Sequence, residues 1–112
     1  MKNIVLIIAF MIGFSANAQE NKNKNAKYTI EVNGNCEQCK KRIEKAAFGV
    51  AGVKSAVWNV ESHKLSLILN EEKTSIAAVE TAVAKVGHDT ETQKSTDEAY
   101  EKLHSCCKYD RK

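Results

Sequence analysis

The amino-acid sequence predicts an α+β fold in which helices cover one face of a small antiparallel sheet, a two-layer sandwich. Short segments that alternate apolar and polar residues indicate half-buried strands, and two longer segments carry apolar residues at helical spacing. Glycines and polar runs separate these segments. With 112 residues, of which 43% are hydrophobic and 28% charged, the chain has room for one compact domain.

The first strand is predicted over Tyr28–Val32, because apolar residues alternate with polar ones there. The loop 33–35 follows. Between Glu37 and Phe48 the period changes, and the apolar residues that share one helical face are Ile43, Ala46, Ala47 and Val50. Gly49 and Gly52 are expected to end this helix.

Two further strands are predicted over Val53–Val60 and Lys64–Leu69. Only three residues separate them, so we expect an antiparallel hairpin. A second helix, capped by Thr74 or Ser75, should end at Gly87. A short polar edge strand is expected at Asp89–Gln93, beyond that helix.

The predicted order is strand, helix, strand, strand, helix, strand, which is the split β-α-β arrangement of ferredoxin-like domains, βαββαβ. We expect this domain to occupy residues 27–93. Residues 94–112 form a C-terminal extension, in which Ser95–Glu98 is typical of a capping box that opens a short helix through Leu103. The extension also carries the pair Cys106-Cys107.

Residues 1–18 are predicted to be a signal peptide. Lys2 supplies a positive start, an apolar run follows, and Ala16-Asn17-Ala18 provides the small residues of a cleavage site. The run is too short to span a bilayer, which needs about 20 residues. We expect residues 19–26 to be a flexible leader. The mature protein should be secreted, periplasmic if the host has an outer membrane, and not embedded in a membrane.

The charge pattern argues against nucleic acid as a partner. The formal net charge is only +3, and the one basic concentration, at residues 40–45, lies on a single predicted helix. The aromatic residues are too scattered to stack bases.

The four cysteines, Cys36, Cys39, Cys106 and Cys107, are the residues that point to chemistry. Paired thiols outside the cytoplasm form disulfides by default, and four cysteines allow three pairings. The cysteines could therefore simply staple the domain. However, Cys36 and Cys39 stand two residues apart at the start of a basic helix, whose charges should lower the pKa of both thiols. Thiolates select Cu(I), Zn(II) or Hg(II), and two sulfurs suit a linear ion better than tetrahedral zinc.

The vicinal pair Cys106-Cys107 leaves several arrangements open. A disulfide between neighbouring residues is strained. If the tail folds back, four sulfurs could form a closed site for zinc or a small copper cluster. Otherwise the tail thiols could bridge to Cys36 or Cys39, or form a second, independent metal site.

A thiol-disulfide oxidoreductase is the alternative from another class, since such enzymes also use Cys-x-x-Cys at a helix start. Those proteins carry a proline within the motif and a cis-proline beside it. This chain contains no proline, so we expect no enzymatic activity.

The segments Asn33–Cys39, Ile43–Ala46, Gly52-Val53, Trp58-Asn59 and Gly87–Asp89 together resemble the heavy-metal-associated domain family, which includes copper chaperones, ATPase metal-binding domains and periplasmic mercury-binding proteins. The resemblance covers about residues 27–93. It implies a ferredoxin-like fold, with Cys36 and Cys39 as ligands of Cu(I), or else of Hg(II) or Zn(II). It also implies that the partners are a metal ion and a membrane metal transporter or another metal-binding domain.

Two positions depart from the family pattern. A methionine usually stands two residues before the first cysteine, where this chain has Gly34. Zinc-type members often carry an acidic residue just before that cysteine, whereas Asn35 is neutral, which favours monovalent copper. His88 follows the glycine that ends the second helix, at a position that in this family lies beside the metal loop. His88, Cys106 and Cys107 are therefore candidates for additional ligands, or, in the case of His88, for a hydrogen-bond donor behind the ligands.

Overall fold

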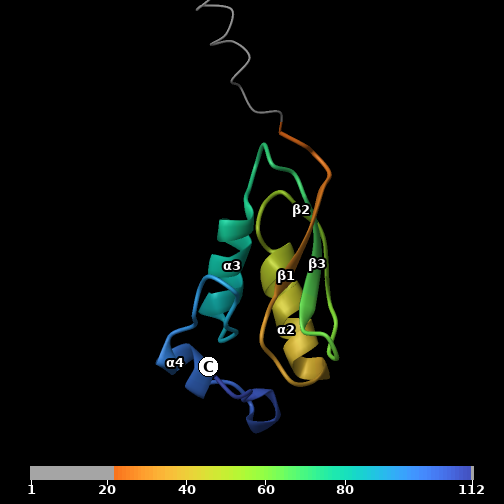
Figure 1. The fold of residues 1–112 in the computed structure, drawn as a ribbon. Coiled ribbons are helices and arrows are strands. Elements are labelled where there is room, and N and C mark those ends of the chain that lie inside the picture. Colours follow the sequence, from red (N-terminus) through yellow and green to blue (C-terminus); the bar gives the residue numbers. More distant parts are fainter. Residues whose placement is uncertain (1–21, 112) are drawn as a thin grey trace, which may run out of the picture.

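The computed structural model describes residues 22–111 and contains a three-stranded antiparallel sheet with two long helices packed against it (Figure 1). The strands are β1 (Ala26–Glu31), β2 (Val53–Trp58) and β3 (Lys64–Leu69), in the order β1-β3-β2. The long helices are α2 (Glu37–Phe48) and α3 (Ile76–Lys85), which contact each other. The predicted α+β fold class is confirmed.

The sheet is built around β3. This strand pairs with β1 from Ala26↔Leu69 to Glu31↔Lys64 and with β2 through Trp58↔Leu65. The hairpin between β2 and β3 forms as predicted, and a bulge shifts its register between Val53 and Ser55. Strand β1 begins two residues earlier than the alternating pattern suggested, because Ala26 is buried against the far end of β3.

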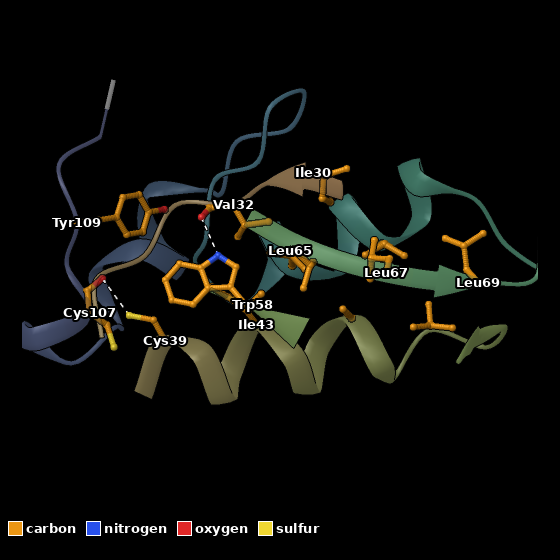
Figure 2. Packing of buried hydrophobic residues seen from close by; sticks show 14 of the residues in the cluster. Ile30, Val32, Cys39, Ile43, Trp58, Leu65, Leu67, Leu69, Cys107 and Tyr109 are labelled. Carbon is orange, nitrogen blue, oxygen red and sulfur yellow. Dashed lines mark hydrogen bonds between the residues drawn. The ribbon is translucent and has the colours of Figure 1, made fainter. Parts of the chain in front are cut away.

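The core lies between the sheet and the two helices, and almost every residue expected to be buried is there. Figure 2 shows Ile43 of α2 and Trp58 of β2 packed against the leucines of β3. The buried members of the predicted core are Ile30, Val32, Ile43, Val53, Trp58, Leu65, Leu67, Leu69, Val79 and Val83. Ile76 packs against this cluster but is only partly buried.

The fourth strand, predicted at Asp89–Gln93, is reduced to a single bridge between Val32 and Thr90. The chain turns immediately afterwards, because the backbone N–H of Thr90 donates to the carbonyl of Gln93 at 2.8 Å. Asp89 is also engaged elsewhere, since one of its carboxylate oxygens accepts from the N–H of Ser95. The bridge still lies beside β1, on the edge where a fourth strand would pair.

The C-terminal extension contains a short helix α4 (Asp97–Glu101) and a 3-10 turn η1 (Ser105–Cys107). Helix α4 is capped by Thr96, whose hydroxyl accepts from the N–H of Ala99, and it ends two residues before the predicted Leu103. Figure 1 shows that the extension returns to the end of the molecule where α2 begins.

No helix within residues 22–111 is long and apolar enough to cross a membrane. The predicted signal peptide, residues 1–18, lies outside the described residues, as do the first residues of the predicted leader.

Candidate metal centre

Cys36 stands directly before α2, as the residue that caps its N-terminus. Its backbone is extended and its side chain makes no capping hydrogen bond, so the thiol is free to face other groups. The preceding loop is fixed at Asn33, whose N–H donates to the carbonyl of Asp89 at 2.9 Å. The indole N–H of Trp58 donates to the carbonyl of Val32 at 3.0 Å (Figure 2). Buried hydrogen bonds from two distant segments therefore hold the loop.

Gly34 explains how this loop does without the methionine of the family pattern. A Cβ atom at position 34 would lie 3.1 Å from Cys39 Cβ and 3.1 Å from the Trp58 ring. The indole of Trp58, which is 1% exposed, thus occupies the space beneath the loop. The chain supports its cysteine loop with a ring from β2, and the loop residue itself has to be small.

The four cysteine sulfurs meet at this end of the molecule. The Sγ of Cys36 lies 3.4 Å from that of Cys39, 3.5 Å from that of Cys106 and 3.1 Å from that of Cys107. All four cysteines are free thiols. In the described part of the chain, the candidate ligand atoms found within 4.8 Å of one another are the sulfurs of Cys36, Cys106 and Cys107. The tail thus folds back over the loop, which is the first of the arrangements left open by the sequence.

Cys39 is placed differently from the other cysteines. It is fully buried and belongs to the hydrophobic core. Its sulfur accepts from the backbone N–H of Asn35 at 3.4 Å and lies 3.9 Å from the carbonyl oxygen of Cys107 (Figure 2). Cys106, by contrast, is exposed, and Cys36 is partly exposed, so the cluster opens to solvent on their side.

Tyr109 anchors the tail beside the cysteines. Its hydroxyl donates to the carbonyl of Gly87 at 2.7 Å and accepts from the backbone N–H of Asp89 at 2.8 Å, and all of these groups are buried. Burial raises the pKa of Tyr109 to about 12, so the hydroxyl stays protonated. The Tyr109 hydroxyl thereby provides the hydrogen-bond partner of two buried backbone groups that follow α3, the carbonyl of Gly87 and the N–H of Asp89.

Arg111 adds a second anchor two residues further on. Its guanidinium forms a two-pronged ion pair with the buried carboxylate of Asp89, with both N···O distances at 3.0 Å. It also lies over the ring of Tyr100, 5.0 Å from the ring centre. Such planar, paired contacts are the geometry in which arginine binds a carboxylate best.

Gly87 allows the close approach of the tail to α3. It has φ +108, a backbone conformation that side chains disfavour. A Cβ atom here would lie 2.8 Å from Leu103 Cδ2 and 2.9 Å from the carbonyl of Ala99. Glycine therefore both ends the helix, as the sequence predicted, and makes room for the extension.

The thiol pKa values differ from the prediction that both loop cysteines would be lowered. Desolvation tends to raise the pKa of Cys36, but hydrogen bonds from Cys107, Cys39 and Cys106 outweigh it and lower the pKa to about 6. Burial raises the pKa of Cys39 to about 12. Lys40, one of the cations expected to act, instead bonds to Glu44 and to the carbonyl of Trp58. The stabilised thiolate is thus Cys36, and the tail thiols, Cys107 first, stabilise it together with Cys39.

His88 supports the loop from behind. Its Nδ1 lies 2.8 Å from the carbonyl oxygen of Asn33 and therefore carries the proton that is donated to it. The ring is fully buried and stacks on Tyr109, and burial lowers its pKa to about 4. Within residues 22–111 its Nε2 has no hydrogen-bond partner, and it is not among the clustered ligand atoms. In its contacts His88 is a residue that supports the cysteine loop through the carbonyl of Asn33.

The anchors Tyr109, Asp89 and Arg111 were not predicted as site residues. The sequence holds little that would reveal them, because Asp89 and Arg111 are 22 positions apart and each is an ordinary charged residue on its own. One signal was available: a tyrosine and an arginine follow the cysteine pair within four residues.

The heavy-metal-associated domain model matches residues 29–89. The chain therefore belongs to the heavy-metal-associated domain family. This family membership and the cysteine cluster together support heavy-metal binding. A search of curated proteins finds no match.

Solved structures with the same fold include a metallochaperone and a Cu(I)-loaded ATPase domain. The CopZ metallochaperone is 27% identical with a TM-score of 0.56, over 58% of this chain and 98% of its own. The Cu(I)-loaded N-terminal domain of a potential copper-translocating P-type ATPase from Bacillus subtilis is 26% identical, with a TM-score of 0.57, 65% of this chain covered and 92% of that domain. Oxidized MerP from Ralstonia metallidurans CH34, at 24% identity and a TM-score of 0.52, shares the fold over 61% of this chain and 100% of its own.

Proposed function

We propose that this protein binds Cu(I) at the cysteine loop and buffers it or delivers it to another metal-binding protein, without catalytic turnover. The observation that carries the proposal is the partly exposed Cys36 thiol, which has three other sulfurs within 3.5 Å and a pKa lowered to about 6. A thiolate is the form that binds a soft ion, and sulfur ligands favour Cu(I) over hard cations.

The proposed ligands in the loop are Cys36 and Cys39. Because Cys39 is buried and its thiol pKa is raised to about 12, it must lose its proton when it binds an ion. Cys36 needs little such activation. We therefore expect Cys36 to capture the ion.

Similarity to CopZ and to the Cu(I)-loaded ATPase domain supports both the choice of metal and a transporter as the partner. We further propose that the protein acts outside the cytoplasmic membrane, after removal of residues 1–18. Mass spectrometry of the protein from its host would test this, and a mature chain that starts at Gln19 is the expected result.

A competition titration tests the copper proposal. Cu(I) is added anaerobically, with a reductant, to a chromophoric Cu(I) chelator and either wild-type protein or the Cys36→Ser variant. Cys36 is only partly buried, so serine leaves the core intact. Wild type should withdraw Cu(I) from the chelator and the variant should not. The matched control is Ser105→Ala, a change of similar size in the tail. Equal withdrawal by Cys36→Ser and wild type would sink the proposal, and parallel titrations with Hg(II) and Zn(II) would show whether another soft ion is preferred.

A further inference from the structure

The two tail thiols, those of Cys106 and Cys107, both lie within contact distance of the Cys36 thiol. Cys107 Sγ is 3.1 Å and Cys106 Sγ is 3.5 Å from Cys36 Sγ, and the two tail sulfurs are 3.9 Å apart. A point equidistant from these sulfurs lies about 2 Å from each, close to a metal–thiolate bond length of about 2.3 Å. The three sulfurs already outline a trigonal site.

The loop pair alone fits an ion less well. A linear two-sulfur site holds its sulfurs about 4.6 Å apart, which is twice the same bond length. The sulfurs of Cys36 and Cys39 are 3.4 Å apart. The loop would have to open by about 1 Å for linear binding, whereas an ion about 1 Å out of the plane of the three sulfurs would reach each of them at a bond length of about 2.3 Å.

The tail is also fixed in this position by buried hydrogen bonds and an ion pair. Tyr109 ties the backbone directly after Cys107 to Gly87 and Asp89, and Arg111 pairs with the buried Asp89 carboxylate. Leu103, just before the cysteines, is buried against Gly87. Anchors on both sides of the cysteine pair hold the two sulfurs over the loop.

The surroundings suit a site with negative charge. Three thiolates and one monovalent ion carry a net charge of −2, and the N-terminus of the twelve-residue α2 faces this cluster through its cap residue Cys36. Lys41 and Arg42, with Gln38 and His104, line a surface hollow on the neighbouring part of α2 and the tail. The side-chain oxygen of Gln38 lies 3.5 Å from Cys106 Sγ, which places that hollow next to the thiols.

We infer that the tail completes the metal site. With the tail docked on the loop, the protein holds a soft, thiophilic cation between Cys36, Cys106 and Cys107. When the tail leaves the loop, Cys39 replaces the two tail cysteines as a ligand. The inference rests on the proposed function and adds the third and fourth ligands to it. In the opening step the bonds from the ion to Cys106 and Cys107 break and a bond to Cys39 forms. The ion keeps its oxidation state. Cys39 releases one proton, the two tail thiolates take up two, and the net proton comes from water.

X-ray absorption at the copper edge, together with the competition titration above, tests this inference on the full mature chain loaded with one Cu(I). The variants are Cys106→Ser, Cys107→Ser and the double variant that carries both changes, and Ser105→Ala is the matched control in the tail. Cys106 is exposed, so its replacement leaves the fold intact. The number of copper–sulfur contacts in Cys106→Ser therefore tests the inference even if Cys107→Ser unfolds the tail.

Wild type should show three copper–sulfur contacts, and Cys106→Ser should show two. Removing both tail thiols should weaken Cu(I) binding by about 100-fold, as expected when ligands on the same chain are lost. Ser105→Ala should keep three contacts and should bind Cu(I) as tightly as wild type. Two contacts in wild type, unchanged in the tail variants, would overturn the inference while leaving the copper proposal standing. Unaltered copper binding by Cys36→Ser would instead remove the proposed function itself.

Discussion

The Tyr109→Phe variant removes the hydroxyl that anchors the tail and nothing else. Two buried backbone groups, the carbonyl of Gly87 and the N–H of Asp89, then lose the partner that the hydroxyl provides. A buried polar group left without a partner costs about 1–3 kcal/mol, so the docked tail should lose about 2–6 kcal/mol for the two groups. A loss of 2 kcal/mol raises the population of the open tail about 30-fold.

Alkylation of Cys107 under native conditions reports that population, because this thiol is fully buried and reacts only when the tail leaves. Labelling in Tyr109→Phe should be about 30-fold faster than in wild type or more, read by mass spectrometry of the tail peptide. Tyr28→Phe is the control, since Tyr28 is exposed and its hydroxyl bonds to Glu71, away from the tail. A Tyr109→Phe rate within about threefold of that control would refute the anchoring argument.

Gly34→Met, which installs the residue usual in the family, should destabilise the domain by about 1–3 kcal/mol in urea unfolding, because the Trp58 ring already fills that space; an unchanged midpoint would contradict this packing. Acid should also weaken the fold, since the His88 pKa is about 4 in the folded protein against an ordinary value of 6.5, so the unfolded chain binds the proton first as pH falls. The free energy of unfolding of wild type should fall by about 3 kcal/mol between pH 6.5 and pH 4, whereas that of His88→Asn should change much less over the same range. Equal pH dependence of the two proteins would show that another group is responsible. Mild oxidation without metal should form the Cys36–Cys107 disulfide first, because these sulfurs are 3.1 Å apart and Cys36 is the thiolate; peptide mapping that finds Cys36–Cys39 first would speak against the closed tail.

Much of the fold could be predicted because hydrophobic periodicity is a local property of the chain. The alternation in β3 and the helical stripe of α3 place Leu65, Leu67, Val79 and Val83 in the core, where the structure has them. The prediction of a fourth strand at Asp89–Gln93 was wrong because contacts with residues further along the chain decide the local structure there. Asp89 is drawn into hydrogen bonds with Ser95 and Arg111, and the chain turns after Thr90.

The spacing of Cys36 and Cys39 was enough to locate the cysteine loop. It was not enough to predict which sulfurs gather around that loop. The predicted lowering of the Cys39 pKa was wrong because burial raises it, and the burial of this thiol depends on distant residues such as Cys107, whose carbonyl oxygen lies 3.9 Å from the sulfur. Where a tail docks is decided by contacts such as Tyr109 with Gly87, which lie 22 residues apart and leave no periodic trace. A sequence pattern could only state the alternatives for Cys106 and Cys107.

The most direct test of the account is an anomalous-scattering map, recorded at the copper edge, from crystals of the mature protein loaded with Cu(I). We predict one peak within bonding distance of the sulfurs of Cys36, Cys106 and Cys107, with Tyr109 still bonded to Gly87. A peak bonded to Cys36 and Cys39 alone, with the tail thiols turned away, would contradict it.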